Sequence, residues 1–256
     1  MLAECHTKQR IAQRFSQAAK RYDQLADVQL QIGLEAIQRM PASSGLVLDI
    51  GCGTGRISRL LADKCQRLLA LDLAEGMTRF AAQAHGNSAD FMVADAEHLP
   101  LTDDCLHGVF SSMVLQWCQP LDRVFSELAR VLKPGAKGLL AIMVEGSLKE
   151  LHQGWLALGQ PTSANAFCSV QDIYTSALRA GLHCQVEDKA YQTWHNSLSE
   201  VLHSMKDIGA GVALSNQPSG LNRHTLGKLE AYYQKAYAKS GRLPISYQVA
   251  FVEIQK

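Results

Sequence analysis

Apolar residues recur along the first forty positions at the three- and four-residue spacing of an α-helix. One stripe occupies the first part of this stretch and a second stripe follows it, and together they predict two amphipathic helices. Pro41 is expected to end the second helix, because proline has no backbone N–H to donate. The residues assigned to the two stripes are Ile11, Phe15, Ala18, Tyr22 and Leu25, and then Leu30, Leu34 and Ile37.

The period changes at Leu46–Ile50, a short apolar run that stops at glycines. Its length and its Val and Ile content favour a buried strand. Alternating strands and helices then follow, which build βαβ units and predict a parallel sheet with helices on both faces. The further strands are expected at 67–71, 90–94, 108–112 and 138–143, and the helices at 56–64, at 75–84 and from Pro120 to the break at Lys133–Gly135.

The rhythm loosens after Val144. Helices are expected at 148–158 and 170–180, and strands at 184–193 and 245–254. Two amphipathic helices, 198–208 and 225–237, stand between these last two strands and make a helical insertion over about 195–240. Ligands bind beyond the carboxyl ends of parallel strands, so the insertion is expected to lie over the ligand site.

Length and composition fit one domain. The 256 residues are 47% hydrophobic and 19% charged, which excludes general disorder. We expect a single α/β domain over 1–256, with N-terminal helices at 1–43, a ligand-binding core at 44–144 and a substrate-side half at 145–256.

Charge, cysteines and hydropathy narrow the function classes. A net charge of +1 argues against a nucleic-acid partner. The seven cysteines contain no C-x-x-C pair, and the histidines do not pair at ligand spacing, so neither a disulfide framework nor a metal site is predicted. No apolar run approaches the roughly 18 residues that span a membrane, and the N-terminus lacks a signal-peptide core. A soluble, cytoplasmic enzyme with no membrane partner is expected.

The strongest chemical signal is the turn Asp49–Gly55, which follows the first predicted strand. Glycines at 51, 53 and 55 let the backbone turn tightly and approach a ligand. The spacing is G-x-G-x-G, and Arg56 stands where the dinucleotide fingerprint would require its last glycine. A ligand smaller than a dinucleotide is therefore favoured, and Asp49 could hold its ammonium group.

Acidic residues end the next two strands. Asp72 is placed to accept hydrogen bonds from two ribose hydroxyls, and Asp95 to bind an adenine amino group, as could Ala96 or Glu97. S-adenosylmethionine combines an ammonium, a sulfonium, a ribose and an adenine, so it fits this set. The residues expected to bind it are Asp49, Gly51, Cys52, Gly53, Gly55, Asp72, Leu73, Met77, Asp95, Ala96, Glu97 and Ser112.

Residues 44–144 resemble the class I methyltransferases. The resemblance rests on Leu48–Gly55, on the acidic strand ends Asp72 and Asp95, and on Val131–Gly135, which occur in the expected order. It implies a Rossmann-like, seven-stranded, mostly parallel sheet, an N-terminal helical lid and a helical insertion before the last strand.

A narrower resemblance covers the chain from about residue 11 to its end. The motifs that carry it look like those of the malonyl-acyl carrier protein O-methyltransferases of biotin synthesis. That family implies methyl ester formation on the free carboxylate of a malonyl thioester, on acyl carrier protein or coenzyme A, so that the product primes pimeloyl synthesis. The motifs are Phe15–Asp23, Val114–Cys118, Gly146–Leu151, Lys206–Ala210 and Gly241–Tyr247.

Four residues are the candidates at the acceptor end. Tyr22 could face the methyl group or bond the malonyl group, Gln116 and Trp117 follow the fourth strand, and Lys206 could pair with the malonyl carboxylate. Tyr22 and Trp117 could instead be core aromatics, and Lys206 a solvated lysine. A carboxylate acceptor is already ionised at pH 7, so alignment and desolvation matter more than a base.

Two departures bear on the substrate. Ala166 stands where the family commonly has an arginine, so Lys206, Arg21 or another base would have to clamp the carboxylate. Asp207 stands where a glycine is common. An acidic carrier protein would dock on basic residues, although exposed charges are usually only solvated. The candidate residues for docking the carrier protein are Lys149, Arg179, Arg223, Lys228 and Arg242. A monomer is favoured as the oligomeric state.

Three other functions stay open. A methyltransferase of another small molecule, a quinone or a lipid would share this core. A nucleic-acid methyltransferase would need a basic face, and such enzymes often carry an Asn/Asp-Pro-Pro-aromatic motif where this chain has Ser112–Gln116. A protein that binds S-adenosylmethionine without catalysis would bind the cofactor and methylate no acceptor.

Overall fold

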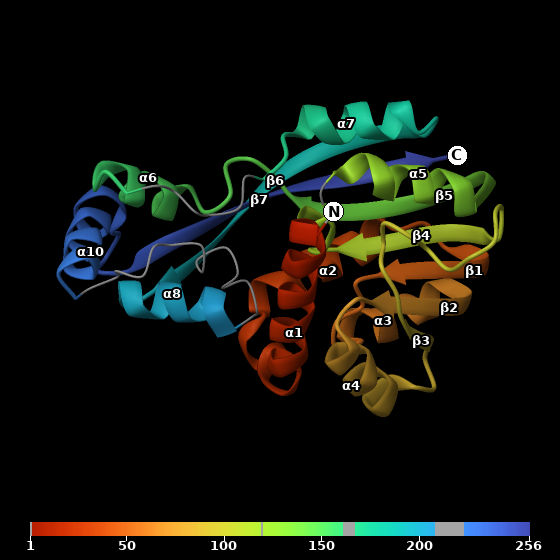
Figure 1. The fold of residues 1–256 in the computed structure, drawn as a ribbon, viewed down its shortest axis with the longest axis horizontal. Helices are drawn as coiled ribbons and strands as arrows, with labels where there is room; N and C mark the ends of the chain where they lie inside the picture. The colour runs from red at the N-terminus through yellow and green to blue at the C-terminus, as the bar shows by residue number, and fades with distance from the viewer. Residues whose placement is uncertain (1, 119, 161–166, 208–222) are drawn as a thin grey trace.

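The computed structural model describes residues 2–118, 120–160, 167–207 and 223–256, and within them the side chains other than those of 2–7 and 205–207 (Figure 1). Its centre is a seven-stranded sheet in the order β3-β2-β1-β4-β5-β7-β6, in which only β7 runs antiparallel to its neighbours. The seven-stranded, mostly parallel sheet is therefore confirmed. The strands are β1 Ser43–Ile50, β2 Cys65–Asp72, β3 Asp90–Val93, β4 Leu106–Ser112, β5 Leu132–Met143, β6 His183–His195 and β7 Leu243–Gln255.

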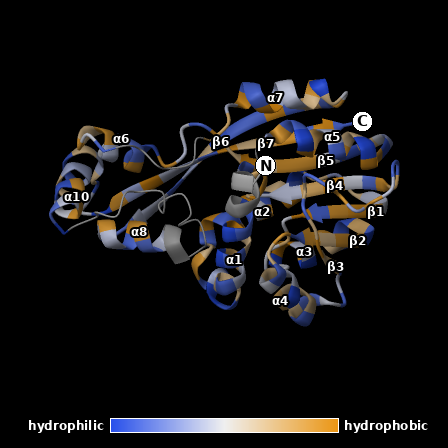
Figure 2. Ribbon diagram, in the orientation of Figure 1, coloured by the Kyte–Doolittle hydropathy of each residue, from blue (hydrophilic) through white to orange (hydrophobic). Residues whose placement is uncertain are grey.

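Helices cover both faces of the sheet because successive strand residues point to opposite sides. Val47 of β1 packs in the same apolar cluster as α2 and α3, whereas Leu48 packs with α5 and α7. Much of β1, β4 and β5 is accordingly orange in Figure 2, whereas β6 is largely blue and the helices carry both colours. None of the described helices is long and apolar enough to span a membrane. The helices that cover the two faces of the sheet are α2 Asp27–Arg39, α3 Arg56–Leu61, α4 Glu75–His85, α5 Leu121–Val131 and α7 Val170–Arg179.

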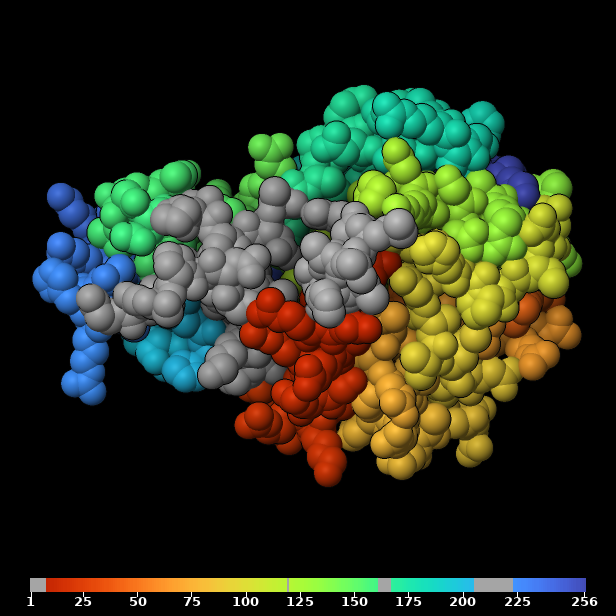
Figure 3. Space-filling model, in the orientation of Figure 1, coloured from red at the N-terminus to blue at the C-terminus, as the bar shows by residue number. Residues whose placement is uncertain are grey.

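The N-terminal helix α1, Leu2–Leu25, packs against α4 through a small apolar contact. Ala19 and Met77 are the buried centre of this contact, and the two helices lie side by side at the surface in Figure 3. The predicted stripe was wrong at its end, because Leu25 is 40% exposed and Ala19 is buried where Ala18 was expected. A weakly apolar helix offers several faces, and only the position of α4 selects one.

The predicted face of α2 was also shifted. Val28, Ile32 and Ala36 are buried against the sheet, while Leu34 is 40% exposed. The apolar residues of this helix are distributed over several of its faces, so its sequence permits more than one stripe at 3.6-residue spacing. Contact with the sheet decides between them.

Helix boundaries differ from the prediction by a few residues. Pro120 lies just outside α5 in an extended conformation, and Lys133–Gly135 already belong to β5. The predicted helix at 56–64 divides into α3 and a short 3₁₀ turn, Ala62–Lys64. Terminal turns often tighten in this way because their last carbonyls lack α-helical partners.

The insertion between β6 and β7 is present. Its described helices are α8, Leu198–Asp207, and α10, Arg223–Tyr237. Helix α10 packs against α6, Lys149–Ala157, and against β7, while α8 contacts α1. These helices gather where β6 and β7 extend away from the rest of the sheet (Figure 1).

Two of the family-specific motifs meet in the interior beside α6. The Glu150 carboxylate, 1% exposed, accepts hydrogen bonds from the backbone N–H (3.1 Å) and the hydroxyl of Ser246. Ser147 Oγ donates to the carbonyl of Gln248 (3.0 Å) and accepts from its N–H (2.9 Å). The motifs 146–151 and 241–247 therefore join α6 to β7 and have a structural role.

Replacing Glu150 by alanine should lower the free energy of unfolding by about 1–3 kcal/mol, because both donors of Ser246 lose their buried acceptor. Urea unfolding measures the effect. Glu145→Ala is the matched control, since that side chain is exposed, and it should change the stability little. Equal stability of the two variants would contradict a structural role for Glu150.

Candidate active site

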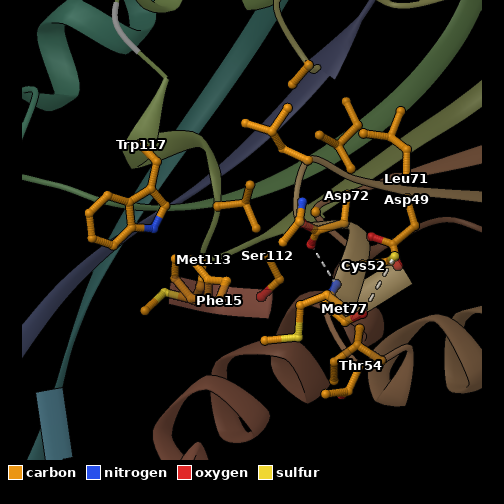
Figure 4. A pocket seen from close by; sticks show the side chains of 18 of the residues that line it. Phe15, Asp49, Cys52, Thr54, Leu71, Asp72, Met77, Ser112, Met113 and Trp117 are labelled. Atoms are coloured by element: carbon orange, nitrogen blue, oxygen red, sulfur yellow. Dashed lines mark hydrogen bonds between the residues drawn. The ribbon is translucent and has the colours of Figure 1, made fainter. Parts of the chain in front are cut away.

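A single continuous pocket lies at the carboxyl ends of the parallel strands and is covered by α1. Its floor is the glycine turn after β1, and its sides come from the ends of β2 and β4 and from the segment after β3. Figure 4 shows side chains from these elements directed into one cavity. The predicted cofactor residues that line it are Asp49, Gly51, Cys52, Gly53, Asp72, Leu73, Met77, Asp95, Ala96 and Ser112.

The turn needs glycine at three positions, but for different reasons. Gly51, Gly53 and Gly55 all have a positive φ, which other residues adopt only with strain. A Cβ on Gly51 would stand 2.2 Å from Val114, whereas a Cβ on Gly53 would meet nothing within 4 Å. Gly53 therefore keeps the pocket open, and Gly51 lets the backbone pass under Val114.

Gly55 does not line the pocket, contrary to the prediction. A Cβ there would come within 3.0 Å of Ala81 on α4 and 3.2 Å of Phe91 on β3. Its role is close packing of the start of α3 against these elements. The sequence spacing gives Gly55 the same expected role as the other two glycines. Only the position of α4 shows that its role is different.

Asp72 connects the end of β2 to the glycine turn. Its carboxylate accepts hydrogen bonds from the backbone N–H of Gly53 (2.9 Å) and of Ala74 (2.7 Å), and Figure 4 shows the first of these. Burial raises its pKa, and the backbone donors oppose that rise. Each oxygen keeps acceptor capacity, so two ribose hydroxyls would find acceptors here.

Asp49 contacts helix α3 through a side-chain hydrogen bond. Its carboxylate is 2% exposed and accepts a hydrogen bond from Ser58 Oγ at 2.6 Å. Burial raises the pKa of Asp49 to about 7, against the opposing effect of Ser58. An ammonium bound beside this group would favour the ionised carboxylate and so lower its pKa again.

The segment after β3 divides between the pocket and the lid. Asp95 and Ala96 line the pocket, but Glu97 does not. The buried carboxylate of Glu97 lies 2.8 Å from Lys8 Nζ and 3.5 Å from Arg123. Lys8 also lies 2.7 Å from Asp95. Lys8 was missed, because a lysine in a polar N-terminal segment gives no sequence signal of a long-range ion pair.

An aromatic wall faces the acceptor end. The rings of Phe15 and Tyr22 lie 6.3 Å apart, and those of Phe15 and Trp117 lie 5.9 Å apart in an edge-on contact. All three line the pocket. Burial, and then the nearby charges of Asp72 and Asp23, raise the pKa of Tyr22. Its hydroxyl therefore stays protonated and can donate a hydrogen bond. Phe15 was assigned to an apolar stripe and to the motif Phe15–Asp23 but to no binding role, so its place in the pocket is new.

Gln116, the next candidate at the acceptor end, lies outside this pocket. Gln116 lines a separate hollow beside α5 and α7, and its amide donates to the carbonyl of Met113 at 2.7 Å. Gln116 and Trp117 share a 3₁₀ turn, in which consecutive side chains point about 120° apart, so they enter different cavities. Lys206 is in the last turn of α8 and Ala166 follows α6, and neither side chain is among those described.

The order of groups along the pocket suits a ribose flanked by a purine and an amino acid. Asp95 follows β3, Asp72 ends β2, and Gly53 leaves open space beyond β1. Met77 and Leu73 add apolar surface near Asp72. The residues present therefore fit S-adenosylmethionine.

Residues 48–140 match the model of a family described as "Methyltransferase domain". The malonyl-[acyl-carrier protein] O-methyltransferase of Pectobacterium atrosepticum is 35% identical over 98% of both chains. The protein of the same name from Yersinia pestis is 35% identical over 95% of this chain and 90% of its own length. The chain belongs to this family. The biotin biosynthesis bifunctional protein BioHC of Cellvibrio japonicus is 33% identical over the whole chain, which spans 51% of that protein.

Solved structures show the same fold. YcgJ from Bacillus superimposes with a TM-score of 0.62 at 16% identity, covering 88% of this chain and 97% of that one. Phosphoethanolamine N-methyltransferase 2 of Haemonchus contortus, with S-adenosylmethionine bound, superimposes with a TM-score of 0.59 at 20% identity. The match covers 94% of this chain and 57% of that one. The chain is a methyltransferase with S-adenosylmethionine as its cofactor.

The raised pKa of Asp49 predicts a pH-dependent stability. Because the folded-state pKa of about 7 exceeds the usual 3.8, the contribution of Asp49 to stability is greatest below pH 4 and falls as pH rises toward 7. Between pH 5 and 8 the wild type should lose about 2–3 kcal/mol relative to Asp49→Asn, which cannot titrate. Urea unfolding at both pH values measures this difference, and parallel curves for the two proteins would show that Asp49 ionises normally.

Proposed function

We propose that this protein transfers the methyl group of S-adenosylmethionine to the free carboxylate of a malonyl group carried by acyl carrier protein. The product is the malonyl methyl ester that primes pimeloyl synthesis for biotin. The observation that carries the proposal is similarity over 98% of both chains to a relative named for this reaction. The motifs 146–151 and 241–247, which meet beside α6, add support outside the cofactor core.

The pocket residues suggest how the cofactor is held. We assign the ribose hydroxyls to Asp72, the adenine to the segment of Asp95 and Ala96, and the methionine part to the turn that includes Gly51 and Gly53. When bound, S-adenosylmethionine supplies an electrophilic methyl group on a sulfonium. The chain needs only to align the acceptor carboxylate and keep water away.

The aromatic wall is suited to both tasks. Phe15, Tyr22 and Trp117 make an apolar surface that displaces water from around the acceptor. The carboxylate of a malonyl group is already ionised at pH 7, so transfer to it requires no base. The protonated hydroxyl of Tyr22 would donate to one carboxylate oxygen and hold the other toward the methyl group.

The cationic clamp for the carboxylate is not assigned to a described side chain. Lys8 and Arg56 are the basic residues among the described part of the pocket lining, and both have partners. Lys8 pairs with Asp95 and Glu97, and Arg56 donates to the carbonyl of Asp23 at 3.1 Å. Arg21 is exposed outside the lining, so Lys206 remains the proposed clamp.

The carrier protein would dock at the end of the molecule that contains the insertion. Lys149 lies on α6, Arg223 and Lys228 on α10, and Arg242 just before β7, and these elements pack together. Arg179 lies apart on α7, 3.4 Å from Asp122. A basic face of this kind would attract an acidic carrier.

The direct test is methyl transfer to malonyl-acyl carrier protein, malonyl-coenzyme A and free malonate, measured by intact mass. We expect a gain of one methyl group on the malonyl thioesters, with carrier protein the preferred carrier. The ratio between the two thioesters measures the contribution of docking. Binding of S-adenosylmethionine without methylation of any of the three would reject the malonyl acceptor and keep the cofactor assignment.

Replacing Tyr22 by phenylalanine should slow methyl transfer about tenfold, because the acceptor loses a hydrogen bond worth on the order of 1.5 kcal/mol. Calorimetric affinity for S-adenosylmethionine should stay nearly unchanged. Tyr174→Phe, at an exposed site on α7, is the control for tyrosine removal. A loss of thermal stability with an unchanged rate would indicate that Tyr22 is only a packing residue.

A further inference from the structure

Two buried polar atoms in the pocket wall have no hydrogen-bonding partner among the described residues. They are Oε1 of Gln29, in the first turn of α2, and Oγ of Ser112, at the end of β4. Both residues line the pocket. Native proteins leave few buried polar groups unpaired, because such groups destabilise the fold. Two of them in one cavity point to a ligand that completes their hydrogen bonds.

The two residues lie on neighbouring parts of the same wall. Gly33 is four residues after Gln29 on α2, about 6 Å along the helix axis. A Cβ on Gly33 would stand 3.6 Å from Ser112 Oγ. The face of α2 that carries Gln29 and Gly33 therefore meets the end of β4.

Position along the sheet identifies the ligand group. The strand order β3-β2-β1-β4 places Asp95, Asp72 and Ser112 in sequence along the carboxyl edge. With adenine toward Asp95 and ribose at Asp72, the methionine end of the cofactor extends toward β1 and β4. That end carries an ammonium, which donates hydrogen bonds, and a carboxylate, which accepts them.

The ammonium also needs an acceptor besides Asp49. Ser58 Oγ already donates to Oδ2 of Asp49 at 2.6 Å. A neutral amide oxygen on the opposite wall would supply a second acceptor without adding charge to a buried site.

We propose that Gln29 and Ser112 bind the amino-acid end of S-adenosylmethionine. The amide oxygen of Gln29 accepts a hydrogen bond from the ammonium, and the hydroxyl of Ser112 donates one to the carboxylate. Binding of the cofactor thereby satisfies both unpaired atoms and connects α2 to the end of β4. The proposal concerns the cofactor alone and does not depend on which acceptor is methylated.

Calorimetry with three ligands tests it. S-adenosylmethionine has both groups, its decarboxylated form keeps only the ammonium, and 5′-methylthioadenosine lacks both. Gln29→Leu should bind the first two about 10- to 100-fold more weakly than the wild type and bind the third equally well. Gln31→Leu, two residues further along α2 and exposed, is the control and should match the wild type throughout.

Ser112→Ala separates the two contacts. It should weaken the binding of S-adenosylmethionine about tenfold or more and leave the affinities for the decarboxylated form and 5′-methylthioadenosine unchanged. Equal losses for all three ligands would show that the variants only disturb the pocket, and unchanged affinity for S-adenosylmethionine would also overturn the proposal. Because every measurement is a binding constant, failure of malonyl methylation would leave this test unaffected.

Discussion

The site depends on how the end of β2 holds the turn that follows β1. The backbone N–H groups of Gly51 and Cys52 both donate to the carbonyl of Leu71, at 2.7 and 2.9 Å. One residue later, the Asp72 carboxylate accepts from Gly53. The turn is thus fixed by three hydrogen bonds from a neighbouring parallel strand, and the same Asp72 faces the ligand. These bonds fix the glycine turn relative to Asp72.

The lid is built on the same support. Helix α4 begins just after Asp72, and α1 packs on α4 through Ala19 and Met77. Tyr22 and Phe15 project from α1 into the pocket, and Lys8 reaches Asp95 and Glu97. Helix α1 is therefore held over the pocket both by its apolar contact with α4 and by the ion pairs of Lys8.

The two halves of the chain differ in their relation to the pocket. The strands within 43–143 border it, and α6, α8 and α10 are joined to that core through the long strands β6 and β7. The hydrogen bonds between Glu150 and Ser246 fix α6 on β7. This explains in physical terms why two of the family's most specific motifs contribute no side chain to the described pocket lining.

The sequence by itself determined the fold and the edge of the sheet at which the cofactor pocket lies. Alternating apolar periods predict the strands, and the strand ends locate Asp49, Asp72 and Asp95, because parallel strands bring their carboxyl ends to one edge. These positions follow from local pattern and chain direction, and the structure places all three in the pocket.

Tertiary structure alone decided which side of each element meets the ligand. Gly55 packs against α4, Gln116 enters a different hollow from Trp117, and Gln29 lines the pocket from a helix whose apolar stripe was assigned to other residues. Each of these outcomes depends on the element packed against it, which lies far away in sequence. The physical reason is that a helix or a turn presents several chemically similar faces, and only its neighbours in space select one of them.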